Sequence, residues 1–174
     1  DRVVVGTNDE RAREVMRQLY RPLSLNETPM VFTERRTSEL IKYAGNGFLA
    51  MKITFINEIA DLCEAVGANV QEVAKGIGLD NRIGRKFLNA GPGYGGSCFP
   101  KDTLALMKTA RDNNAPIELI EATVRVNSAR KQKMAQKIID AIGGDLKGKT
   151  IAVLGLTFKP NTDDMRDAPA LDIV

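Results

Sequence analysis

The 174-residue chain contains no histidine and no tryptophan, and it has only two cysteines. Without histidine it can form no Ser–His or Cys–His pair, and it offers no imidazole as an acid, a base or a metal ligand. Cys63 and Cys98 lie too far apart in the sequence to make a zinc site. Any catalysis must therefore use cysteine, lysine, asparagine, a carboxylate or backbone groups, and we expect no metal.

Strong net charge and long apolar runs are also missing. The 25 Lys and Arg residues are nearly balanced by 22 Asp and Glu, which gives a formal charge of +3. Acidic residues are interleaved with the basic ones, so no nucleic-acid footprint is expected. No apolar run approaches the ~20 residues of a membrane span, and the first ten residues show no signal-peptide pattern. We therefore expect neither a nucleic-acid nor a membrane partner.

The two ends of the chain have the pattern of α/β domains. Residues 2–6 and 29–32 are short β-branched or apolar runs, which predict strands. Between them, a helix capped by Asn8 or Asp9 is expected to run to about Tyr20. Residues 150–155 read as a central parallel strand. Such short pieces need more sheet beside them, so each is expected to be part of a larger α/β domain.

The middle of the chain is predicted to be helical. The expected helices cover residues 38–66, a short stretch after Asn69 ending near residues 76–78, residues 100–111, and the stretch from Pro116 to residues 143–144. We expect Thr37 to cap the first helix, Gly67 to end it, and residues 130–133 to form a solvated face. The apolar spacing of the helix predicted over 38–66 indicates a core stripe: Ile41, Ala44, Phe48, Met51, Phe55, Ile59 and Leu62.

The Gly-rich stretch 91–96 is the most informative segment. It formally contains G-x-G-x-x-G, but it follows no strand and carries Pro92 at the tight turn. A dinucleotide-binding fingerprint requires a strand before it and a helix directly after it. We therefore interpret the stretch as backbone with free N–H groups that approaches an anion or a sugar.

Cys98 lies just before the helix predicted to start at Pro100. Unpaired N–H groups at a helix start favour a thiolate, and Lys101 adds positive charge. Asp102, four residues on, can share its face of the helix. A small buried cysteine behind a flexible loop is the alternative interpretation. Cys63, in an apolar helix, is expected to be structural.

Lys42 and Asn46 are four residues apart on the first long helix, so they share a face. Apolar residues surround them. Lys42 either extends its ammonium group to solvent or stabilises an oxyanion beside the amide of Asn46.

Residues 37–46, 91–103 and 155–160 together resemble the UDP-glucose/GDP-mannose dehydrogenase family, and its UDP-glucose branch most. The segment 95–102, GGSCFPKD, is the most specific part. The resemblance implies a mainly α chain, in which a helical central dimerisation domain (34–146) lies between incomplete pieces of two Rossmann-like domains. Residues 1–33 would end the NAD-binding domain, and residues 147–174 would begin the UDP-binding domain.

Enzymes of this family oxidise a sugar-nucleotide alcohol to the acid with two NAD molecules, through a cysteine thioester. The resemblance makes Cys98 the nucleophile and Asp102 the carboxylate that assists water, with Lys42 and Asn46 at the oxyanion. The implied substrate contacts are Arg82 (to the neighbouring subunit's substrate), Phe87, Leu88, Asn89, Tyr94, Gly95, Phe158 and Lys159. Lys101 and Arg166 are the residues it places near NAD.

The implied reaction is the oxidation of UDP-glucose to UDP-glucuronate by a cytoplasmic homodimer. Oxidation of GDP-mannose or of a UDP-N-acetylhexosamine, or a role solely as a dimerisation module, are the alternatives. The family's Gly-rich NAD-binding segment should lie before residue 1, so we expect this stretch by itself to be inactive.

Overall fold

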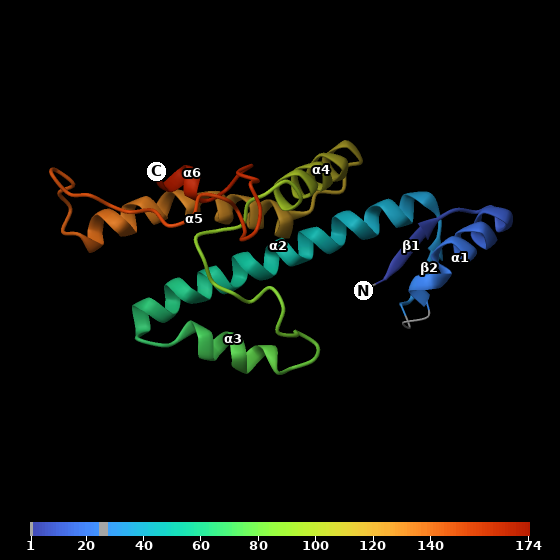
Figure 1. Ribbon diagram of the computed structural model, residues 1–174, viewed down its shortest axis with the longest axis horizontal. Helices are drawn as coiled ribbons and strands as arrows, with labels where there is room; N and C mark the ends of the chain where they lie inside the picture. The colour runs from blue at the N-terminus through green and yellow to red at the C-terminus, as the bar shows by residue number, and fades with distance from the viewer. Residues whose placement is uncertain (1, 25–27) are drawn as a thin grey trace. The chain divides into compact units, whose positions relative to one another are not determined.

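The computed structural model describes residues 2–24 and 28–174. The chain forms two compact units, Asp1–Gly45 and Asn46–Val174, and the long helix α2 (Arg35–Val66) contributes residues to both. Helices account for most of the described chain, and strands for very little (Figure 1). The prediction of a mainly α chain is confirmed.

The first unit contains a βαβ motif. Strands β1 (Val3–Gly6) and β2 (Met30–Thr33) pair in parallel, and α1 (Glu10–Ser24) connects them. Asp9 caps α1, since its Oδ1 accepts hydrogen bonds from two N–H groups of the first turn at 2.8 and 3.2 Å. The predicted motif is confirmed, although α1 extends beyond Tyr20.

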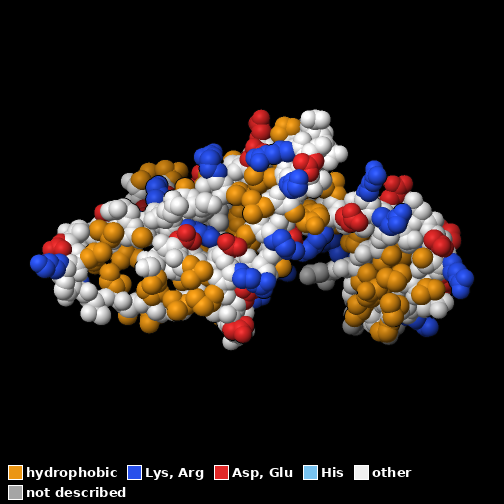
Figure 2. Space-filling model, turned by 90° about the horizontal axis from the view of Figure 1, so that it is seen from above, with side chains coloured by type: hydrophobic (Ala, Val, Ile, Leu, Met, Phe, Trp, Pro, Cys, Tyr) orange, Lys and Arg blue, Asp and Glu red, His pale blue; other side chains and the backbone are white. Residues whose placement is uncertain are grey.

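Two strands and one helix cannot cover their own apolar faces. Hydrophobic side chains accordingly gather on the surface of this motif, at the right of Figure 2. The large exposed ones are Val15, Leu19, Leu23 and Val31.

The second unit is helical. After α2 come α3 (Val70–Gly78), α4 (Phe99–Asp112), α5 (Glu118–Ala141) and α6 (Ala170–Ile173), and both α4 and α6 contact α5 (Figure 1).

The predicted ends of these helices are mostly confirmed. Gly67 ends α2 with a φ of 72°, and Asn69 caps α3 by accepting a 2.9 Å hydrogen bond from the N–H of Gln71. Pro100 lies in the first turn of α4. Thr37 is not a cap, because α2 already begins at Arg35.

The predicted core stripe of α2 is wrong in its face. Phe48, Phe55 and Leu62 are exposed. Apart from Ile56, the buried residues are small or polar: Asn46, Gly47, Ala50, Thr54, Asn57, Ala60 and Cys63. This face of α2 packs through small residues because α5 lies close to it: a Cβ on Gly47 would lie 3.0 Å from Cδ1 of Ile120. Cys63 is buried, as expected of a structural cysteine.

Two further predictions are corrected. Residues 150–155 form no strand, because within the described residues no strand lies beside them to complete a ladder; Leu154 is 94% exposed. The solvated face predicted for residues 130–133 is wrong for Arg130 and Lys131, which are buried because their side chains bond to backbone carbonyl groups.

Candidate active site

Cys98 lies immediately before α4 and is exposed to solvent. The alternative of a buried cysteine is therefore wrong. The guanidinium of Arg166 lies near the thiol: the pKa of Arg166 is raised, chiefly by its hydrogen bond with Asp164 and by that carboxylate's charge, with a smaller contribution from Cys98. The sulfur thus sits at a helix start, with the guanidinium of Arg166 nearby.

One turn further along α4, the structure brings Asp102 together with Asn46 of α2. Nδ2 of Asn46 donates a 2.6 Å hydrogen bond to Oδ2 of Asp102, and both residues are buried. The other carboxylate oxygen lies 3.1 Å from Nζ of Lys101, whose side chain is exposed. The carboxylate is therefore held in one orientation by two partners. Lys42 is exposed on the part of α2 that belongs to the first unit.

A cavity of about 480 Å³ opens between the Gly-rich loop, α2 and the C-terminal segment. Five predicted substrate residues line it: Phe87, Asn89, Tyr94, Gly95 and Phe158. Gly93, which lies in the Gly-rich stretch singled out from the sequence, also lines it, and sequence reasoning missed the other three lining residues, Ile53, Lys86 and Phe99. The positions of Lys86 beside Phe87 and of Phe99 beside Cys98 are the signals that could have revealed two of them.

The remaining predicted substrate residues do not line this cavity. Leu88 is buried, and Arg82 forms an ion pair with Asp80 at 2.6 Å while 90% of its side chain stays exposed. Nζ of Lys159 lies over the Phe158 ring, 5.2 Å from its centre, which is a cation–π contact.

Three aromatic rings organise one wall of the cavity. The ring of Phe99 contacts those of Phe87 and Tyr94 edge to face, with centroids 6.0 and 5.9 Å away. Burial raises the pKa of the Tyr94 hydroxyl, and a hydrogen bond with Thr103 partly opposes this. Phe87 has a φ of 66°, an unusual conformation for a bulky residue. Such strain at a cavity wall is typical of functional sites.

Three N–H groups of the Gly-rich loop are held by other parts of the chain, whereas the sequence predicted free ones. The N–H of Gly91 bonds to Asn57, that of Tyr94 bonds to Asn127, and that of Gly96 bonds to the carbonyl of Arg166 at 2.8 Å. Glycine is instead needed for close contact with the C-terminal segment, since a Cβ on Gly96 would lie 2.7 Å from the Phe158 ring. The loop is therefore anchored at Gly91, Tyr94 and Gly96.

The described part of the chain includes no helix with the length and apolar character needed to cross a membrane.

Comparison with known proteins gives two family matches. Residues 36–129, more than half of the chain, match the central domain of the UDP-glucose/GDP-mannose dehydrogenase family. Residues 152–174 match the UDP-binding domain of that family.

Individual proteins match along the whole chain. A UDP-glucose 6-dehydrogenase of Rhizobium meliloti (strain 1021) is 72% identical over 100% of this chain and 40% of its own length. A solved UDP-glucose dehydrogenase from Pyrobaculum islandicum has a TM-score of 0.91 and 40% identity, over 99% of this chain and 39% of its own. A UDP-D-ManNAc dehydrogenase from Pyrococcus horikoshii has a TM-score of 0.81 and 30% identity, over 98% and 40%. The chain spans about two fifths of the length of the curated relatives that it matches.

Proposed function

Because the chain belongs to the UDP-glucose/GDP-mannose dehydrogenase family, we propose that it is the central part of an enzyme that oxidises UDP-glucose to UDP-glucuronate. The observation that carries the proposal is the exposed thiol of Cys98 at the start of α4, one turn before the buried Asn46–Asp102 pair. The choice of UDP-glucose rests on the 72% identity to a UDP-glucose 6-dehydrogenase.

Cys98 is the nucleophile of this proposal. Loss of hydride and a proton from the C6 alcohol gives an aldehyde. The Cys98 thiolate adds to the aldehyde carbon, and the oxygen takes up the proton released in the oxidation, which gives a thiohemiacetal. Loss of a second hydride and a proton gives a thioester, and water then displaces the thiolate to give the carboxylate. The covalent bond keeps the intermediate at one place between the two oxidations. None of the groups proposed for these steps is a histidine, which the sequence lacks.

Asp102 and Asn46 serve the hydrolysis in this scheme. The hydrogen bond from Asn46 orients the carboxylate of Asp102, which can accept a proton from the attacking water. We propose Lys42, one helical turn before Asn46, as the cation that stabilises the oxyanion as it develops.

A nicotinamide cofactor supplies the hydride acceptor for both oxidations. The βαβ motif of this chain does not fit the pyrophosphate of such a cofactor, because the carboxylate of Asp9 already occupies the N-terminus of α1. We propose Lys101 and Arg166, whose side chains are 73% and 70% exposed, as this chain's contacts to the cofactor. Lys101 lies three residues after Cys98 in the sequence, and Arg166 lies near Cys98 in space.

The 480 Å³ cavity is our proposed site for the nucleotide and its sugar. The rings of Phe87, Tyr94 and Phe158 offer flat apolar surfaces, on which a base or a sugar can stack, and the ammonium group of Lys159 lies over the ring of Phe158. Asn89 supplies an amide for hydroxyl groups. A substrate and a cofactor of this kind are consistent with a cytoplasmic enzyme.

We further propose that the exposed apolar face of α2 pairs with a second copy of the chain. Phe48, Phe55, Leu62 and Val66 on this face are 48–66% exposed, and a soluble monomer rarely shows such a continuous patch. The exposed guanidinium of Arg82 would then reach the partner's substrate. Light scattering should show a dimer, and Phe48→Glu with Phe55→Glu should yield monomers, whereas Leu104→Glu on α4 should not. A monomeric unsubstituted protein would contradict this.

The reaction is tested on the longest natural form of the polypeptide, with UDP-glucose and NAD. We expect two NADH for each UDP-glucuronate. Cys98→Ser should stop acid formation after the first oxidation, whereas the matched variant Cys63→Ala should keep it. Normal acid formation by Cys98→Ser would refute the mechanism. A panel with GDP-mannose and UDP-N-acetylhexosamines decides the substrate, and no oxidation of any of them would leave the dimerisation module as the function.

A further inference from the structure

Helix α5 carries a buried polar face that the proposed reaction does not use. Asn127, Arg130 and Lys131 are 5%, 8% and 9% exposed, and their spacing places them on one side of the helix. Burial of two cations and an amide is costly unless each is fully hydrogen-bonded. Their partners therefore indicate what the face is for.

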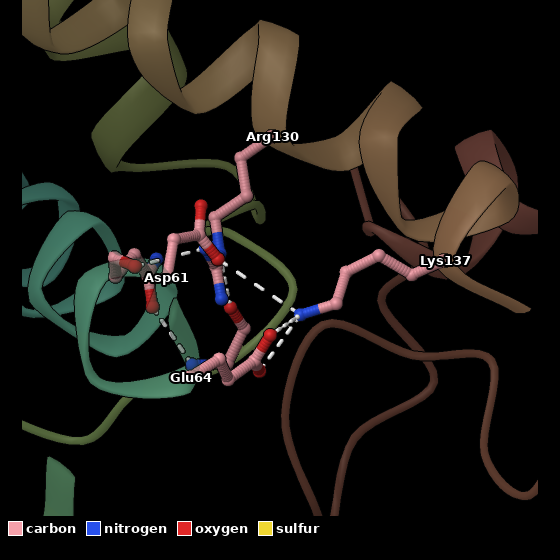
Figure 3. A network of polar contacts seen from close by, with 6 residues as sticks. Asp61, Glu64, Arg130 and Lys137 are labelled. Carbon is pink, nitrogen blue, oxygen red and sulfur yellow. Dashed lines mark hydrogen bonds and ion pairs between the residues drawn. The ribbon is translucent and has the colours of Figure 1, made fainter. Parts of the chain in front are cut away.

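Arg130 ties the start of the Gly-rich loop to α2. Its Nε donates a 2.6 Å hydrogen bond to the carbonyl of Gly91, and its Nη1 donates to the carbonyl of Asn57 and to Oδ1 of Asp61, each at 2.9 Å. Oδ1 of Asn57 accepts the N–H of Gly91 at 2.8 Å. Figure 3 shows Arg130 reaching from α5 to Asp61, beside the ion pair of Lys137 with Glu64. Both backbone groups of Gly91 are thus held by buried side chains.

Asn127 holds the other end of the same loop. Its Oδ1 accepts the N–H of Tyr94 at 2.8 Å, and its Nδ2 donates to the carbonyl of Tyr94 at 3.1 Å. Between the two anchor points the loop lies flat on α5, since a Cβ on Gly93 would lie 3.0 Å from Cγ of Lys131. Side chains thus supply the backbone hydrogen bonds that a strand or a helix would otherwise provide.

These anchors fix the wall of the cavity that includes Phe99, the residue after Cys98. Tyr94 packs its ring on Phe99, and two glycines and one serine connect it to the sulfur. A shift of Tyr94 would therefore move the substrate relative to Cys98. Lys131 acts elsewhere: its Nζ donates to the carbonyl of Asp167 at 2.9 Å, in the segment that brings Phe158 to the cavity.

We propose that Asn127 and Arg130 are positioning residues, which hold the loop 91–96 so that the reacting carbon of the substrate meets the sulfur of Cys98. This inference rests on the proposed function for its effect on turnover. The anchoring itself is independent of any substrate. Two separate measurements therefore test the two parts.

Hydrogen exchange tests the anchoring. In the longest natural form of the protein, Asn127→Ala and Arg130→Met should each speed amide exchange in the peptide 89–97 by tenfold or more. Asn127→Ala removes the acceptor of the Tyr94 N–H. Arg130→Met removes the donor that holds the carbonyl of Gly91, and so loosens the residue whose N–H bonds to Asn57. Arg125→Met, an exposed residue of the same helix, is the matched control and should leave exchange unchanged. Arg130→Lys provides a milder variant should Arg130→Met unfold. Unchanged exchange in all anchor variants would overturn the proposal.

Turnover tests the positioning. Asn127→Ala should lower kcat about 10²-fold, as expected for a reacting group misplaced by about 1 Å, with KM changed less than about threefold. Lys131→Met should instead raise KM, since it loosens the segment that carries Phe158. A purely structural role would lower the melting temperature of both variants without this split in kcat and KM.

Faster exchange with an unchanged kcat would overturn the positioning role. No oxidation of any sugar nucleotide by the unsubstituted protein would refute the proposed function, and exchange would then decide on the anchoring by itself.

Discussion

Replacing Gly96 with alanine tests how tightly the Gly-rich loop packs against the C-terminal segment. Gly96 has a φ of 82°, which costs an L-residue about 1–2 kcal/mol. The added Cβ would lie 2.7 Å from the Phe158 ring, and such overpacking costs about 1–3 kcal/mol. We therefore expect Gly96→Ala to lower the free energy of unfolding by about 2–5 kcal/mol, measured by urea unfolding.

Gly84 provides a control that separates the two costs. Its φ of 71° is similar, but nothing lies within 4 Å of an added Cβ, so Gly84→Ala should lose only the backbone part, about 1–2 kcal/mol. In a Phe158→Ala background, Gly96→Ala should fall to the same value. Equal losses for Gly96→Ala and Gly84→Ala in the unsubstituted background would refute the packing of Phe158 on this loop.

Three more predictions concern polar and titrating groups. Asn46→Leu removes the hydrogen bond to buried Asp102 and should cost about 1–3 kcal/mol in urea unfolding, whereas Gln132→Leu on the exposed side of α5 should not. The hydrogen bonds from Arg166 lower the pKa of Asp164 to about 2; its stabilisation is present above pH 3.8 and is lost as the pH falls through about 2, and an NMR midpoint near 3.8 would contradict this. Burial raises the pKa of Tyr94 above 10.0, so its contribution is complete below pH 10 and is lost as the pH rises through the raised value; in ultraviolet titration a tyrosine step above pH 10 should be present, and Tyr94→Phe should remove it.

Features with a local cause were predictable from the sequence. Asn69 caps a helix, Gly67 ends one and Pro100 lies in a first turn because each acts on neighbours within a few residues. The βαβ motif follows from patterns of the same range. The strand at residues 150–155 failed because pairing depends on a partner that a single run of residues does not specify.

Burial was harder to predict, since distant segments decide it. On α2 the large apolar residues have helical spacing, but the small face packs because α5 approaches Gly47. On α5 the pattern of the charged run predicts a solvated face. Arg130 and Lys131 are nevertheless buried, because backbone carbonyl groups of other segments accept their hydrogen bonds and offset the cost of removing the cations from water.

The candidate site likewise combines local features, which the sequence predicts, with contacts between distant segments, which it does not. The position of Cys98 before a helix, and the turn that separates it from Asp102, could be predicted from spacing. The contact of Asp102 with Asn46 joins two helices, and the cavity joins Phe87 with Phe158; only family resemblance connected these residues in advance. Lys86 stands directly before Phe87 in the sequence, and that position is the signal that sequence reasoning did not use.

The double anchor on α5 also limits how the loop can change in length. Gly91 and Tyr94 are three residues apart, and so are their anchors Arg130 and Asn127, which face them in reverse order. Inserting or deleting one residue between Gly91 and Tyr94 would leave at most one anchor in register. Surface loops usually tolerate such changes, but homologous chains that keep both anchors should keep this spacing too.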